Sequence, residues 1–213
     1  MIIDLHNHTI PLSRDSTLEP ISLISRVASL GIDGVCLTEH DAAWDSKEVQ
    51  EIAAAYGIVV IPGMEVTTEI GHILVFGLDR YQPEMASMRR LAEIATSEGA
   101  AMILAHPHRS SAYSNYWTRS DESYGSLNFD FAIHGVEIFN GRGSQSENMF
   151  SAKVAHSLQL PGTGGSDAHH LVEIGECVTE FEDVIDDLDS LLGALRSGRM
   201  VGRMFKEGRL GHS

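Results

Sequence analysis

The segment DLHNHT, residues 4–9, follows two isoleucines and places His6 and His8 two positions apart. In an extended strand, side chains at positions i and i+2 point to the same face of the sheet. The two imidazoles are therefore expected to point into one space at the end of a first strand. A pair of histidines that share one space indicates a common partner, which is either a metal ion or an acidic side chain.

The composition limits the class of protein. The chain has 213 residues, enough for one sizeable core, and its hydrophobic content of 43% is typical of a soluble globular domain. The 30 acidic residues against 15 lysines and arginines give a formal net charge of −15. Such a charge argues against binding of long nucleic acids or anionic membranes by bulk electrostatic attraction.

The cysteines and the apolar segments favour a cytoplasmic protein. Cys36 and Cys177 are too few for a disulfide framework, so we expect a reducing compartment. We expect no signal peptide, because the start lacks a basic segment followed by an apolar one. No apolar stretch approaches the roughly 18 residues that a membrane-spanning helix needs.

Short apolar strands alternate with helical patterns along most of the chain. The predicted strands cover residues 2–5, 34–38, 58–61, 72–76, 101–105, 135–139 and 177–181, with a further short apolar segment around Leu160. The predicted helices cover residues 18–30, 46–56, 84–98, 144–158 and 185–197. This alternation predicts an α/β fold with a parallel sheet. We expect one domain over residues 1–213, in which about seven strands form a closed or nearly closed barrel.

Residues 107–130 differ from the rest of the chain. They are rich in Ser, Tyr, Asn and Arg and show no sustained period. A structureless stretch of this length is uncommon in compact domains, so we expect a long functional loop. Its aromatic residues either stack on a base or ring of a substrate or attach the loop to the barrel, and the sequence does not choose between these roles.

Residues able to bind metals follow the predicted strands. The candidate set comprises His6, His8, Asp15, His40, Glu65, His72, His106, Asp167 and His169. His72 departs from the pattern because it opens its strand, and Asp15 could instead cap the helix at residues 18–30. In barrels of parallel strands, chemistry gathers at the carboxyl ends of the strands. We therefore expect the nine side chains to meet at one rim.

The size and chemistry of this set indicate several metal ions. Nine ligands are too many for one tetrahedral zinc ion, which takes four. Imidazole and carboxylate suit manganese, iron or zinc, so we expect two or three of these divalent ions. Such ions lower the pKa of a bridging water and hold the oxygens of a phosphoryl group. We expect Arg109 and Arg142 to contact substrate phosphate, since a guanidinium binds two oxygens at once.

These residues lie in motifs that resemble those of the PHP (polymerase and histidinol phosphatase) superfamily. The motifs are DLHNHT at 4–9, TEHD at 38–41, PGME at 62–65, GHILVFG at 71–77, AHP at 105–107 and GGSDAH at 164–169. The resemblance covers nearly the whole chain. It implies a distorted seven-stranded, TIM-like β/α barrel, a PHP domain over residues 1–213, and a trinuclear centre held by the nine candidate ligands. Glu39 departs from the family pattern, which often has Asp there, and His134 stands where an acidic residue is common.

The sequence favours a small stand-alone phosphoesterase that uses a metal-bridging hydroxide. Its substrate is expected to be a small phosphorylated compound such as histidinol phosphate, a sugar phosphate, a nucleoside 3′,5′-bisphosphate or the end of a short oligonucleotide. Two alternatives stay open. One is hydrolysis of a carbon–nitrogen bond, as in amidohydrolases, which use a similar barrel. The other is a metal-binding domain without catalytic activity.

Overall fold

A computed structural model describes residues 1–107, 131–206 and 209–210 of the chain. Arg109 and all of the expected loop except Pro107 therefore lie outside the described residues. No helix among the described residues is long and apolar enough to cross a membrane.

In the described part of the chain, ten strands form one sheet in the order β10-β9-β8-β1-β2-β3-β4-β5-β6-β7. The strands are β1 (Ile2–Asp4), β2 (Gly34–His40), β3 (Val59–Thr68), β4 (Gly71–Phe76), β5 (Ala101–Leu104), β6 (Gly135–Asn140), β7 (Gly162–Gly165), β8 (Cys177–Phe181), β9 (Met200–Lys206) and β10 (Arg209–Leu210). The helices are α1 (Pro20–Ser29), α2 (Ser46–Ala53), α3 (Met88–Glu98), α4 (Gln145–Leu158) and α5 (Leu188–Ser197), with short 3₁₀ turns η1 (Pro83–Ala86) and η4 (Leu171–Glu173).

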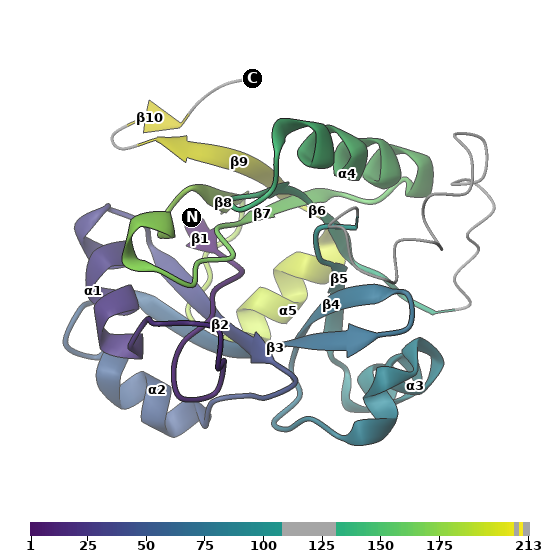
Figure 1. Ribbon diagram of the computed structural model, residues 1–213, viewed down its shortest axis with the longest axis horizontal. Helices are drawn as coiled ribbons and strands as arrows, with labels where there is room; N and C mark the ends of the chain where they lie inside the picture. Colours follow the sequence, from purple (N-terminus) through teal and green to yellow (C-terminus); the bar gives the residue numbers. More distant parts are fainter. Residues whose placement is uncertain (108–130, 207–208, 211–213) are drawn as a thin grey trace.

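The sheet is a nearly closed barrel, because the chain beyond β7 returns to the chain beyond β1. The amide of Asp167 donates to the carbonyl of His6 at 2.7 Å, and the amide of His8 donates to the carbonyl of Ala168 at 3.0 Å. Figure 1 shows the strands as a ring through which α5 is seen. The DLHNHT and GGSDAH motifs thus lie side by side at the seam of the barrel.

The prediction of an entirely parallel sheet is wrong, although an α/β barrel is confirmed. β1, β2 and β3 are parallel, as are β5, β6 and β7, but β4 runs antiparallel to both of its neighbours. Only residues 69–70 join β3 to β4, which is too short for the crossover that parallel neighbours need. β8 is also antiparallel to β1 and to β9.

The expected count of seven strands is not confirmed. β9 and β10 follow α5, where no strand was expected, and β3 continues to Thr68 rather than ending near Ile61. The segment expected around Leu160 is β7, whose sequence GTGG carries no apolar side chain to mark it as a strand. The helix expected over residues 84–98 is divided into η1 and α3 at Ser87.

The helix ends follow from capping side chains and glycines. Asp45 accepts hydrogen bonds from the second and third amides after it at the start of α2, and Asp187 accepts from the amide of Ser190 at the start of α5. These contacts satisfy amides that have no partner within the helix. At the other end, α3 and α5 stop at Gly99 and Gly198, whose positive φ angles suit a residue without a side chain.

The core lies on both sides of the sheet. Inside the barrel, Ile3, Leu5 and Phe76 pack with Leu191 and Leu195 of α5. A second apolar cluster joins α1 and α2 to the outer face of β2, and a third joins α3 and α4 to β4, β5 and β6. Both cysteines, Cys36 and Cys177, are buried free thiols.

The close contacts of β7 with β8 and β9 depend on glycine. A Cβ atom added to Gly202 would lie 2.4 Å from the backbone of Thr163, and one added to Gly164 would lie 2.4 Å from the carbonyl oxygen of Val178. Such contacts are far inside van der Waals distance. Glycine at these positions therefore lets the strands approach closely enough to complete the barrel wall.

We expect Gly202→Ala to lower the free energy of unfolding by about 1–3 kcal/mol, because the new methyl group overpacks the β7–β9 contact. Gly193→Ala is the matched control, since nothing lies within 4 Å of its added Cβ in α5. That control should raise the free energy of unfolding by about 0.5–1 kcal/mol through helix propensity. Denaturant unfolding of both variants checks this, and a Gly202→Ala protein as stable as the wild type would contradict it.

Candidate metal centre

The nine predicted ligands converge at one end of the barrel. They reach it from β1, β2, β3, β4, β5 and the loop after β7, and His72 belongs because β4 is antiparallel. The start of an antiparallel strand lies at the same rim as the ends of its parallel neighbours. His72 and Glu65 are diagonal neighbours on one face of the β3–β4 pair, since Glu65 lies opposite Leu74 and Thr67 lies opposite His72.

Glu65 is the central acceptor of the cluster and is only 1% exposed. Nitrogen atoms of five histidines lie within 3.5 Å of its carboxylate. They are His72 Nδ1 and His106 Nε2 at 2.8 Å and His6 Nε2 at 3.5 Å from Oε1, and His40 Nδ1 at 2.9 Å and His8 Nε2 at 3.3 Å from Oε2. One carboxylate therefore connects candidate ligands from four separate parts of the chain.

Asp167 is a second buried carboxylate in the cluster. Its Oδ1 atom lies 3.3 Å from His8 Nε2 and 3.7 Å from His6 Nε2, and His169 Nδ1 lies 3.6 Å from it. Asp167 and His106 both have positive φ angles, 53° and 26°, which non-glycine residues adopt rarely. Strain of this kind at a cluster of ionisable groups is typical of functional sites.

Asp15 forms the solvent side of the cluster, with its side chain 57% exposed. Its Oδ2 atom lies 3.2 Å from Nε2 of both His40 and His169. It does not cap α1, whose N-cap is Glu19. Partial burial would raise the pKa of Asp15, but the two imidazoles outweigh this and hold the pKa below its usual value.

The buried groups of the cluster compensate one another electrostatically. Burial alone would raise the pKa values of Glu65 and Asp167, yet the imidazole of His6, with further histidines, holds both well below their usual range. Burial alone would lower the pKa of His6, but Glu137, Asp167 and Glu65 raise it well above its usual value. The site therefore favours cationic charge at its centre.

The residues fit divalent ions. Four overlapping groups bring their ligand atoms within 4.8 Å of one another: His8, His40 and His169; His6, His8 and Asp167; His6, His106 and Glu137; and His40, Glu65 and His72. Two nitrogen ligands of one ion are about 3.0–3.4 Å apart, and His6 Nε2 and His8 Nε2 are 3.0 Å apart. The Oε2 atom of Glu65 is buried, and among the described residues no donor forms a hydrogen bond of suitable geometry to it. A bound cation would supply the missing partner for this oxygen.

Glu137 was missed by the sequence analysis. It is buried in β6, and its Oε1 atom lies 2.9 Å from His6 Nδ1. Its Oε2 atom accepts hydrogen bonds from the His106 amide and from Asn140 Nδ2, both at 3.0 Å. A carboxylate on the outer nitrogen of a histidine commonly orients that ring toward a metal. The available signal was one acidic residue inside the apolar strand GVEIF.

Of the two predicted phosphate-binding arginines, only Arg142 lies in the described residues. Its side chain is 38% exposed at the rim. Its Nη1 atom is 2.9 Å from His169 Nδ1, and its Nε atom is 3.8 Å from Glu173 Oε1. His134, which was left out of the candidate set, instead accepts a hydrogen bond from the Met102 amide.

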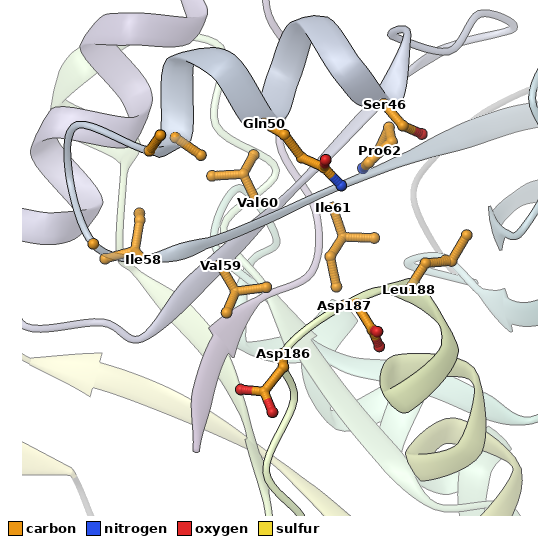
Figure 2. Close-up of a pocket in the computed structure, with 13 residues that line it drawn as sticks. Ser46, Gln50, Ile58, Val59, Val60, Ile61, Pro62, Asp186, Asp187 and Leu188 are labelled. Atoms are coloured by element: carbon orange, nitrogen blue, oxygen red, sulfur yellow. The ribbon is translucent and has the colours of Figure 1, made fainter.

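A groove formed by other parts of the protein is separate from the cluster. It lies between α2, the first part of β3 and the residues that open α5, with a cavity volume of about 430 Å³ (Figure 2). Ile61 and Val59 line it beside Asp186 and Asp187 (Figure 2). None of the candidate ligands contributes to it, so the histidine cluster remains the candidate catalytic site.

The sequence of the chain matches two known protein families. The family described as "PHP domain" matches residues 4–147, and the family described as "PHP-associated" matches residues 145–200. The chain belongs to the PHP family. Membership of this superfamily, predicted from the six motifs, is thus confirmed.

Two named PHP relatives are enzymes. The 3′,5′-nucleoside bisphosphate phosphatase of Chromobacterium violaceum is 34% identical over 89 residues, which are 40% of this chain and 30% of that protein. The 5′-3′ exoribonuclease of Haemophilus influenzae is 29% identical over 89 residues, covering 40% of this chain and 32% of that protein. The prediction of a hydrolase acting on phosphoesters is confirmed at the level of the PHP family.

A solved structure agrees with the PHP fold. It is a two-domain protein from Bacteroides vulgatus containing a predicted PHP-like metal-dependent phosphoesterase, with a TM-score of 0.70 and 22% identity. The likeness covers 96% of this chain and 65% of that one, so this chain spans about two thirds of that protein. At this identity the comparison shows the fold.

We expect metal affinity to fall as the pH falls from 8 to 5.5. A histidine must lose its proton to bind a metal, and the raised pKa of His6 means that protons already compete for it above pH 6.5. Each proton released on binding weakens the apparent affinity by up to about tenfold per pH unit. Competition titrations with Zn²⁺ across this range measure the effect, and an affinity independent of pH would contradict ligation by His6.

We expect Glu137→Gln to weaken metal binding by roughly 10–100-fold, because it removes the charge that orients His6 and replaces one acceptor oxygen with a donor. Glu93→Gln is the matched control, since Glu93 is exposed on α3 and forms ion pairs with Arg89 and Arg90 of the same helix. Calorimetric titration of both metal-free variants measures the change. Equal affinities of the Glu137→Gln variant and the wild type would leave Glu137 without a role at the centre.

Proposed function

We propose that this PHP protein is a metal-dependent phosphoesterase with two or three divalent ions of manganese, iron or zinc. The proposed ligands are His6, His8, Asp15, His40, Glu65, His72, His106, Asp167 and His169. The observation that carries the proposal is the approach of five histidine nitrogens to within 3.5 Å of the Glu65 carboxylate. A trinuclear arrangement agrees with the size of the ligand set and with its overlapping groups.

The chemistry of such a site suits phosphoester hydrolysis. Divalent ions, when bound, activate water as a nucleophile and neutralise the charge that develops on a phosphoryl group. The chain supplies the geometry around them: Glu65 and Asp167 fix the positions of the histidines, and Glu137 orients His6. We propose that Arg142 at the rim binds the substrate phosphate, since a guanidinium can donate to two oxygens at once.

For the substrate, we propose a small phosphorylated compound, first a nucleoside 3′,5′-bisphosphate or the end of a short oligonucleotide. One named relative is a phosphatase of nucleoside 3′,5′-bisphosphates, and the other is an exoribonuclease that works in the 5′-3′ direction. The net charge of −15 supports a small substrate over a long nucleic acid, because repulsion grows with every phosphate outside the ions' reach. Histidinol phosphate and sugar phosphates belong to the same chemical class and are tested alongside.

The test is a hydrolysis assay of the purified protein loaded in turn with Mn²⁺, Fe²⁺ and Zn²⁺. The panel contains an aryl phosphate, a nucleoside 3′,5′-bisphosphate, a short 5′-phosphorylated oligonucleotide, histidinol phosphate, a sugar phosphate and an N-acyl amide. We expect turnover of at least one phosphoester. Turnover of the amide alone would indicate carbon–nitrogen hydrolysis, and metal binding without any turnover would favour a non-catalytic domain.

Within that assay, we expect Glu65→Gln to lower kcat/KM by about 100-fold or more, since it removes a charge contacted by five histidines. His156→Ala is the control, because His156 is exposed on α4 and outside the cluster. It should retain wild-type activity. A Glu65→Gln variant that binds metal and turns over substrate like the wild type would refute the assignment of the site.

A further inference from the structure

A fourth buried carboxylate, Glu39, lies next to the candidate metal centre without facing it. Its side chain is fully buried in β2, between Thr38 and His40. Its two oxygens accept four hydrogen bonds: from the Thr9 amide at 2.7 Å, the Thr9 hydroxyl, the Ser13 hydroxyl at 2.5 Å and Trp44 Nε1 at 2.9 Å. Every group that contacts it is a donor, so the site requires a carboxylate.

The Ser13 hydroxyl connects Glu39 to the ligands. Its oxygen accepts a hydrogen bond from the His40 amide at 3.2 Å and lies 3.2 Å from His8 Nδ1. A hydroxyl has one proton to donate and two lone pairs to accept with. Because that proton is given to Glu39, the oxygen can interact with His8 Nδ1 only as an acceptor.

This constraint selects one tautomer of His8. When Nδ1 carries the proton that Ser13 accepts, Nε2 is left with its lone pair. His8 Nε2 is the atom that lies 3.3 Å from both Glu65 Oε2 and Asp167 Oδ1, inside the cluster. The same lone pair allows His6 Nε2, 3.0 Å away, to donate to it in the absence of a cation.

We propose that Glu39 is a positioning residue that acts through Ser13 to keep the proton of His8 on Nδ1, so that Nε2 is free to bind a metal ion. This inference rests on the proposed metal centre, because a free Nε2 serves to bind a metal ion there. The tautomer of His8 itself does not depend on catalysis. Glu39 also holds the chain at Thr9 and Ser13 against β2. A purely structural role would therefore affect stability without affecting the His8 tautomer.

Three variants separate these roles. Ser13→Ala removes the acceptor for His8 Nδ1, and Glu39→Gln places an amide donor against groups that all donate. Trp44→Phe is the matched control, because it removes one donor to Glu39 and leaves the Ser13 hydroxyl in place. A small structural loss is common to all three variants, whereas loss of the His8 tautomer is expected only for the first two.

The experiment records ¹⁵N-histidine NMR spectra of the metal-free proteins and titrates each with Zn²⁺. In the wild type and Trp44→Phe, we expect His8 as the Nδ1–H tautomer and affinities within about twofold of each other. In Ser13→Ala and Glu39→Gln, we expect a mixed His8 signal and affinity lower by roughly 10–100-fold. A double variant that combines Ser13→Ala with Glu39→Gln should lose no more Zn²⁺ affinity than the weaker-binding of the two single variants, because both changes break the same chain of contacts.

An unchanged His8 tautomer in Ser13→Ala, or losses that add fully in the double variant, would overturn the inference. If Glu39→Gln does not fold, as judged by circular dichroism, Ser13→Ala decides the question because it removes a single oxygen. Absence of Zn²⁺ binding by the wild type would instead count against the proposed function. The tautomer of His8 in the metal-free protein would still decide the role of Glu39.

Discussion

Burial of several carboxylates at one rim of the barrel is the constraint on which the site depends. Glu65, Asp167 and Glu137 are each about 1% exposed and lie among the same histidines. An isolated buried charge is costly, so such groups persist only when paired with cationic or donor groups. The imidazoles supply that compensation in part, and bound cations would complete it. The same arrangement that would destabilise an ordinary core therefore creates a strong preference for metal ions.

The metal centre and the closure of the barrel share the same contacts. The backbone hydrogen bond from Asp167 to His6 joins the chain after β7 to the chain after β1 and also sets two candidate ligands side by side. Gly165 allows this approach, since an added Cβ would lie 2.4 Å from the Cβ of His6. A ligand that binds only the folded state stabilises it by mass action. Metal binding is thus expected to hold the seam closed as well as to supply chemistry.

Sequence reasoning located the nine candidate ligands, which the structure brings together, because strand ends are easy to read. DLHNHT, TEHD and AHP each follow a continuous apolar run, and the topology brings such ends to one rim. The prediction of a parallel sheet was wrong at β4 because apolar runs do not reveal the direction of a strand. The two-residue turn between β3 and β4 makes β4 antiparallel to β3. β7 was misplaced because glycines that permit close approach carry no hydrophobic signal. Glu137 was missed because it lies within a strand, where its partners come from distant parts of the chain.

Exposure within the cluster suggests an order of binding. His6 and His8 are fully buried, whereas His40 is 30% exposed and Asp15 is 57% exposed. A substrate that approaches from this exposed side meets Asp15, on a protein whose net charge is −15. A phosphate anion meets repulsion there unless cations have already reversed the local field. Ions are thus expected to bind before substrate, because the acidity of the protein attracts the cations that would make a phosphorylated substrate acceptable.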